Sequence, residues 1–195
     1  SGSMSREMLD TVKQLYNLVW FCKKVNIPFE VYAFTNEWKR REQDSTGQWN
    51  PVDNELAYEV QEYNLRVEED FSLMNLLTSK VRTNELEHQL KNIWRIATVF
   101  ANTYGSRYSY PTRLCLSGTP LNEALMTLHK LLPKFQKDNN VEKVQCIVLT
   151  DGEANSVPYH VLTKDYFNSD EWKMGMRSIN PGHCSLRDRS LGKTY

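Results

Sequence analysis

The sequence lacks the features that mark several protein classes. It has no apolar run near the roughly 20 residues that a membrane-spanning helix needs, and no segment like a secretion leader. Basic and acidic residues balance at 24 each, so net charge favours neither nucleic acid nor an anionic membrane as a partner. The four cysteines are widely spaced and form no Cys-x-x-Cys pair, which is typical of reduced, buried thiols. We therefore expect a cytoplasmic protein.

What the chain does contain is enough apolar sequence for a sizeable core. It has 195 residues, of which 40% are hydrophobic, and this fits one domain. We expect a single domain over residues 1–195.

Helical spacing of apolar residues predicts several helices. One covers Met8–Trp20 and ends near Lys23 and Lys24. Two more fall between Ser72 and Thr103, the first on Leu73, Leu76 and Leu77 and the second from Leu86 to Ala101. Another begins at Thr119-Pro120-Leu121, where Pro120 suits a first helical turn and Thr119 would be the N-cap.

Short apolar runs predict strands at Phe29–Phe34 and, most clearly, at Val144–Leu149. Alternation suggests an edge strand over Leu56–Val67, while polar Lys39–Asn54 indicates a loop and Cys184–Tyr195 a hairpin. Strands that alternate with helices imply a mostly parallel sheet covered on both faces.

Three distant segments offer hard oxygen ligands beside a glycine: Ser1-Gly2-Ser3-Met4, Ser117-Gly118-Thr119-Pro120-Leu121 and Leu149-Thr150-Asp151-Gly152-Glu153. Hydroxyls and a carboxylate suit Mg²⁺ or Mn²⁺. Each segment alone is unspecific, because a threonine before a helix is also a good cap and Asp-Gly is a common turn. Together, at strand ends and helix starts, they predict one metal site at one rim of the sheet.

These motifs resemble the metal-ion-dependent adhesion site of von Willebrand factor A domains, Asp-x-Ser-x-Ser with a distant Thr and a more distant Asp. Ser1, Ser3, Thr119 and Asp151 match four of the five positions, and the first Asp would lie two residues upstream of Ser1. The resemblance implies a three-layer, Rossmann-like α/β fold with a mostly parallel central sheet and helices on both faces. It also implies that the first strand and the last helix and strand are missing, so that both ends are cut.

The same resemblance implies a binding module rather than an enzyme. Ser1, Ser3 and Thr119 would be direct ligands of Mg²⁺ or Mn²⁺, and Asp151 a direct or water-mediated one. One coordination position would stay open for a partner's carboxylate. Ser-Gly-Ser-Met and Val31–Thr35 resemble the intracellular branch, which includes the cobaltochelatase subunit and proteins associated with MoxR-type AAA+ ATPases; an ATPase of this type is the expected partner.

Other interpretations stay open. Ser1–Met4 could be an artificial Gly/Ser leader. A Mg²⁺-dependent hydrolase or phosphotransferase is a second hypothesis, although the sequence has no Gly-x-x-x-x-Gly-Lys loop and no aspartate two residues after Asp151. A degenerate scaffold without metal is a third. Glu153 could add charge near the ion, but we expect a solvated loop carboxylate. We interpret His160 as a surface histidine. The spacing of His88, His129 and His183 suits no zinc site.

Overall fold

The chain forms two compact units. The structure, a computed structural model, describes residues 4–36, 41–51, 59–67, 70–101, 110–111, 114, 117–164, 171–180 and 182–194. Unit 1 comprises Ser1–Asp53 and Asp70–Asn155, and unit 2 comprises Asn54–Glu69 and Ser156–Tyr195. The expected single domain over residues 1–195 stays a prediction.

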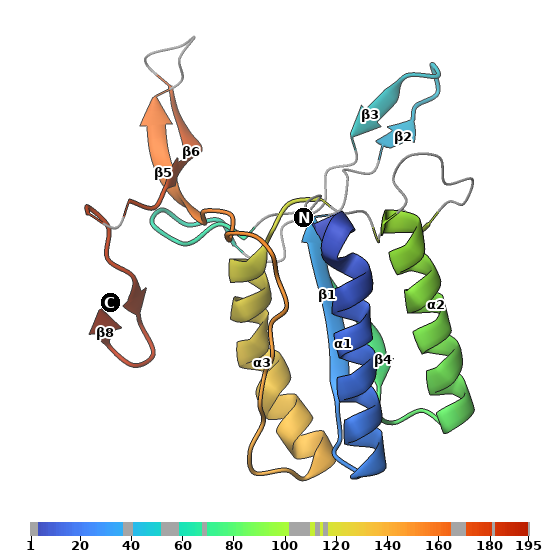
Figure 1. Cartoon of the computed structure of the whole chain (residues 1–195). Coiled ribbons are helices and arrows are strands. Elements are labelled where there is room, and N and C mark those ends of the chain that lie inside the picture. Colours follow the sequence, from blue (N-terminus) through green and yellow to red (C-terminus); the bar gives the residue numbers. More distant parts are fainter. Residues whose placement is uncertain are drawn as a thin grey trace. The chain divides into compact units, whose positions relative to one another are not determined.

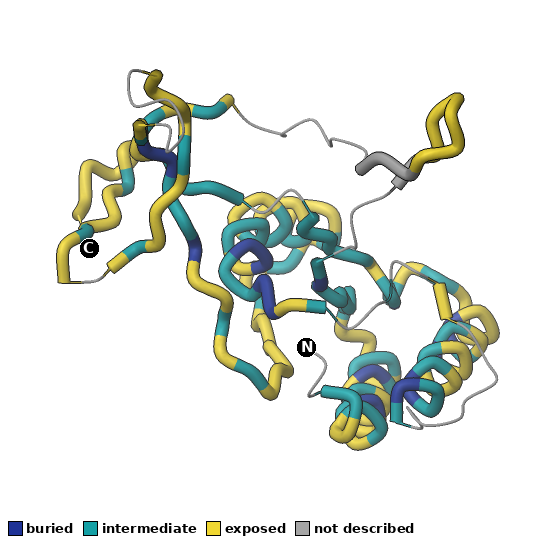
Figure 2. The backbone as a smooth tube through the Cα atoms, turned by 90° about the horizontal axis from the view of Figure 1, so that it is seen from above, coloured by how far each residue is buried: buried dark blue, intermediate teal, exposed yellow. Residues whose placement is uncertain are grey.

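Unit 1 contains the three long helices, α1 (Met4–Lys24), α2 (Thr83–Ala101) and α3 (Leu121–Asn139). All three were predicted from apolar spacing, and their existence is confirmed. α1 ends on Lys23 and Lys24, where positive charge is favourable at a helix C-terminus. Buried residues recur at helical spacing in α1 and α2, as the short dark blue stretches of tube in Figure 2 show.

The core of unit 1 lies where α1 and α2 cover a two-stranded sheet. Strand β1 (Glu30–Asn36) pairs antiparallel with β4 (Phe71–Thr78), with a bulge between Val31 and Tyr32. The sheet and both helices contribute to one buried cluster of Val19, Leu77, Leu86 and Leu90. Figure 1 shows α1, α2 and this sheet packed together. β1 confirms the strand predicted at Phe29–Phe34.

The sheet topology overturns the expected fold. The described strands form four separate two-stranded sheets, β1–β4, β2–β3, β5–β6 and β7–β8, and every pair is antiparallel. The predicted three-layer, Rossmann-like arrangement with a mostly parallel central sheet is therefore wrong, and so is the resemblance to von Willebrand factor A domains. Alternation of strands and helices along a sequence does not determine which strands pair, and the prediction depended on that step.

Two local predictions in unit 1 are also wrong. Leu73, Leu76 and Leu77, expected on a helix, lie in strand β4, because a run of eight residues is too short for spacing to separate the two structures. The expected loop Lys39–Asn54 contains a hairpin of β2 (Arg41–Gln43) and β3 (Trp49–Pro51). The turn of this hairpin is closed by Asp44, whose Oδ1 accepts from the backbone N–H groups of Thr46 and Gln48.

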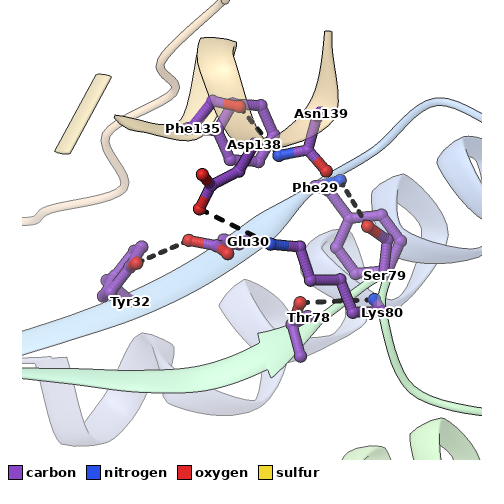
Figure 3. Close-up of polar contacts among 9 residues, drawn as sticks. All are labelled: Phe29, Glu30, Tyr32, Thr78, Ser79, Lys80, Phe135, Asp138 and Asn139. Atoms are coloured by element: carbon purple, nitrogen blue, oxygen red, sulfur yellow. Dashed lines mark hydrogen bonds and ion pairs between the residues drawn. The ribbon is translucent and has the colours of Figure 1, made fainter. Parts of the chain in front are cut away.

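One ion pair joins the chain just after β4 to α3, and other polar contacts lie within the β1–β4 sheet and its end (Figure 3). Lys80 Nζ lies 3.8 Å from Asp138 Oδ2, and the Ser79 hydroxyl accepts a 3.1 Å hydrogen bond from the Phe29 backbone N–H. Within β1, the Tyr32 hydroxyl donates to Glu30 at 2.6 Å. Burial raises the pKa of Tyr32 above its ordinary 10.0, and the hydrogen bond to Glu30 raises it further.

The clearest predicted strand, Val144–Leu149, is not a strand in the structure. Gln145 to Leu149 are all exposed, with Ile147 57% exposed. Val141 donates its backbone N–H to Gln136 near the end of α3, and Asn155 donates to Thr119 just before the start of α3. The segment between them therefore runs back along the length of the helix, as the orange trace in Figure 1 shows.

Unit 2 contains a hairpin of β5 (Pro158–Lys164) and β6 (Trp172–Ser178). A second, short hairpin of β7 (Arg187–Asp188) and β8 (Lys193–Thr194) confirms the one predicted at Cys184–Tyr195. Of the edge strand predicted at Leu56–Val67, residues 56–58 lie outside the described residues. Residues 59–67 contain no strand; Leu65 makes one isolated bridge to Tyr159, and backbone hydrogen bonds join Tyr63, Asn64 and Arg66 to β5.

Candidate functional site

The candidate site lies at the start of α3, in a segment that we name the Thr119 loop (Ser117–Pro120). The Ser117 carbonyl accepts two hydrogen bonds from the end of β1, one from the Asn36 backbone N–H at 3.1 Å and one from the Thr35 hydroxyl at 3.1 Å. Thr35 is 5% exposed. These bonds fix the Thr119 loop against the sheet.

Gly118 allows this close approach. Its φ is +61°, and a Cβ added there would lie 2.7 Å from Asn36 Nδ2 and 3.4 Å from Asn155 Nδ2. Only glycine combines a left-handed backbone with space for two neighbouring amides. The glycine beside Thr119 therefore has a structural role in bringing the ends of β1 and α3 together.

The Thr119 hydroxyl does not cap the helix. The N-cap is Pro120, one residue later than predicted, and it forms no side-chain cap hydrogen bond. The Thr119 side chain is 9% exposed, and in the part of the chain that the structure describes its hydroxyl makes no hydrogen bond. Of the two roles that the sequence allowed, helix cap or ligand, the first is excluded.

The segment that carries Asp151 reaches the same place. Asn155 donates its backbone N–H to the Thr119 carbonyl at 3.0 Å, and its own carbonyl accepts from Asn122 Nδ2 at 2.8 Å. Asp151 lies four residues earlier, so its Cα is within about 14 Å of that of Asn155. Its side chain is exposed and makes no hydrogen bond or ion pair among the described residues.

Ser1 and Ser3 lie outside the described residues. The helix that follows them can be placed: Met8 of α1 lines the same apolar cavity of about 120 Å³ as Thr35 of β1. Thr35 in turn donates to Ser117. The first turns of α1 therefore lie at the end of unit 1 that carries the Thr119 loop.

Sequence inspection missed three residues of this site: Asn36, Asn155 and Glu123. Glu123 is 1% exposed in the first turn of α3, and a carboxylate is favourable there because of the helix dipole. Its position three residues after Pro120 is a signal of an N-terminal turn. The two asparagines carry no such signal, because their roles depend on contacts between distant segments.

Other residues considered from the sequence lie elsewhere. Glu153 is exposed, as expected. His160, expected at the surface, is instead 5% exposed in β5, and its backbone exchanges hydrogen bonds with Tyr63 and Asn64, which lie beside β5. Cys146, expected to be buried, is exposed, while Cys22 and Cys184 are partly exposed.

Among the described residues, no three histidine, cysteine, aspartate or glutamate side chains form a group that could hold a metal ion. In the same described part of the chain, no helix has the length and apolar character to span a bilayer.

Comparisons with known proteins add no relative. No protein family, no curated protein and no solved structure matches the chain.

Proposed function

We propose that this chain is a binding module rather than an enzyme, and that it holds Mg²⁺ or Mn²⁺ beside the Thr119 loop and, through the cation, an acidic group of a protein partner. The observation that carries the proposal is Thr119: the residue as a whole is 9% exposed, and its hydroxyl neither caps α3 nor makes another hydrogen bond among the described residues. A hydroxyl without a protein partner keeps its lone pairs available to a cation.

The contacts of unit 1 support a shared site. The Asn155–Thr119 hydrogen bond joins the segment that carries Asp151 to the Thr119 loop. The Cα of Asp151 therefore lies within about 14 Å of that of Asn155. The cavity shared by Met8 and Thr35 keeps the start of α1, and therefore the chain directly after Ser1 and Ser3, at the same end of the unit. Hydroxyl and carboxylate oxygens are the donors that these hard cations prefer.

The proposed ligands are Ser1, Ser3, Thr119 and Asp151. One carboxylate among four ligands leaves the cation with net positive charge, and such a centre attracts a partner's carboxylate. The AAA+ ATPase partner and the hydrolase hypothesis are not part of this proposal, because no contact of the described residues favours either of them. We also expect a cytoplasmic location, which the scattered cysteines support.

The experiment is a titration of the full chain with Mn²⁺, followed by electron paramagnetic resonance. Thr119→Val and Asp151→Asn should each weaken Mn²⁺ binding by about tenfold or more, since each removes an oxygen donor. Glu153→Gln is the matched control: it removes a neighbouring exposed carboxylate and should leave the affinity unchanged. Equal Mn²⁺ binding in all four proteins would contradict the site, and no binding at all would favour a scaffold without metal.

The partner is tested with two short peptides that differ in one residue. A peptide with a central aspartate should bind the full chain in Mn²⁺ and dissociate when the cation is chelated. The same peptide with asparagine should not bind in either condition. Binding of the aspartate peptide that survives chelation would show that the cation takes no part.

A further inference from the structure

The exposed segment Val144–Leu149 has the character of a strand without a neighbour. In the part of the chain that the structure describes, none of its backbone N–H or C=O groups makes a hydrogen bond. Ile147, Val148 and Leu149 are 57%, 41% and 39% exposed. An apolar, β-branched run with free backbone groups is a template for pairing with another strand.

The segment is also held in place for such pairing. The hydrogen bond from Val141 to Gln136 anchors one end, and the bond from Asn155 to Thr119 anchors the other. The intervening residues are therefore tethered at both ends along α3. The ordering cost of a pairing strand is therefore partly met before a partner arrives.

Charges at the two ends specify the partner and its direction. Seven uncharged residues, 144–150, lie between Lys143 and Asp151, and neither charge forms an ion pair among the described residues. In an antiparallel pair of two identical segments centred on Ile147, each Lys143 lies opposite an Asp151 of the other copy. A parallel, in-register pair would instead place like charges opposite each other, which is unfavourable.

We propose that residues 143–151 pair with the same residues of a second copy of this chain, antiparallel and with Ile147 opposite Ile147. The pair has two-fold symmetry, so that it closes after two copies. Side chains alternate along a strand, and Val144, Cys146 and Val148 of both copies form one apolar face. A two-stranded ribbon alone is marginal in water, so the dimer is weak and forms at high protein concentration.

A charge swap tests the proposal by sedimentation equilibrium of the full chain, in chelator and without divalent cation. The wild-type chain should dimerise with rising concentration. Lys143→Asp alone and Asp151→Lys alone each place like charges opposite each other at both ends, and each should dimerise at least about tenfold more weakly. An equimolar mixture of the two variants restores opposite charges at both ends and should dimerise like the wild type.

A wild-type chain that stays monomeric, or a mixture as weak as its components, would overturn the proposal. If the wild-type chain stays monomeric, the strand that pairs with Val144–Leu149 would have to belong to a different protein. Because cation is absent, these outcomes are independent of the proposed metal site, which the Mn²⁺ titration tests separately.

Disulfide trapping tests the register. In a Cys146→Ser background with oxidised glutathione, Ile147→Cys should link to itself across the dimer, since facing Cα atoms in an antiparallel pair are about 4.5–5.5 Å apart. Leu149→Cys faces Gln145 of the other copy and should not link to itself. Peptide mapping distinguishes disulfides of the introduced cysteines from those of the other cysteines. Linking by both variants would indicate parallel stacking, and linking by neither would exclude the pair; either result contradicts the proposed register.

Discussion

Two apolar segments of unit 1 look alike in sequence and differ in structure. Phe29–Phe34 becomes β1, in which no residue is exposed and every residue from Glu30 to Asn36 has a partner in β4. Val144–Leu149 is at least as apolar, yet Gln145 to Leu149 are exposed and the segment has no backbone hydrogen bond among the described residues.

The difference shows what an apolar run determines. Both segments have the composition of a strand, but pairing also needs a second segment and a layer that covers the pair. β1 has β4 beside it and α1 and α2 over the sheet, whereas Val144–Leu149 runs along α3 between two anchors. The unpaired segment is consequently available for contact with another molecule.

The largest expected effect comes from truncating an apolar side chain in each region. Leu77→Ala should cost about 2–5 kcal/mol of unfolding free energy, because Leu77 is 1% exposed in β4 and the change leaves a cavity. Ile147→Ala, at a 57% exposed position, should change the free energy by no more than about 0.5 kcal/mol. Urea unfolding of dilute protein measures both, and similar losses would remove the distinction between the two regions.

A smaller effect is expected where β1 meets the Thr119 loop. Gly118→Ala should cost about 1–2 kcal/mol for the left-handed backbone, and more because its Cβ would lie 2.7 Å from Asn36 Nδ2. The same change in an Asn36→Ala background keeps the backbone strain and relieves the crowding, so it should cost less. Equal costs in both backgrounds would show that the side chain of Asn36 does not limit this contact.

The smallest effect is a pH dependence confined to β1. The folded state raises the pKa of Tyr32 through burial and the Glu30 hydrogen bond, so the unfolded chain loses its tyrosine proton first as pH rises. The resulting stability is complete below about pH 10 and is lost as pH rises through the folded-state pKa. The urea midpoint should fall further between the lower and the upper end of that pH range for the wild type than for Tyr32→Phe. Parallel curves of urea midpoint against pH would mean that Tyr32 is not linked to folding.

Much of unit 1 could be predicted from the sequence, and the pairing of its strands could not. Long amphipathic patterns such as Leu86–Ala101 predict helices well, because many residues report the same spacing. Leu73, Leu76 and Leu77 fit a helix equally well over a single short run, and only their pairing with β1 decides for a strand. The expected parallel sheet failed for the same reason, since pairing is a property of distant segments.

For the candidate site, too, one part could be predicted from the sequence and another could not. Thr119 and Asp151 were recognisable because hydroxyl and carboxylate groups beside glycines have a plain chemistry. The hydrogen bonds that join their segments, from Asn36 to Ser117 and from Asn155 to Thr119, use backbone atoms that every residue has. No composition or spacing identifies such contacts, so the convergence of the segments needed the structure.

Amide hydrogen exchange of the dilute full chain tests the contrast between the two segments most directly. The backbone amides of Val144–Leu149 should exchange at the rate of an unstructured peptide, because they have no hydrogen-bond partner among the described residues. Those of β1 and β4 that pair across the sheet should be strongly protected. Protection of Val144–Leu149 equal to that of β1 in dilute, monomeric protein would contradict the account.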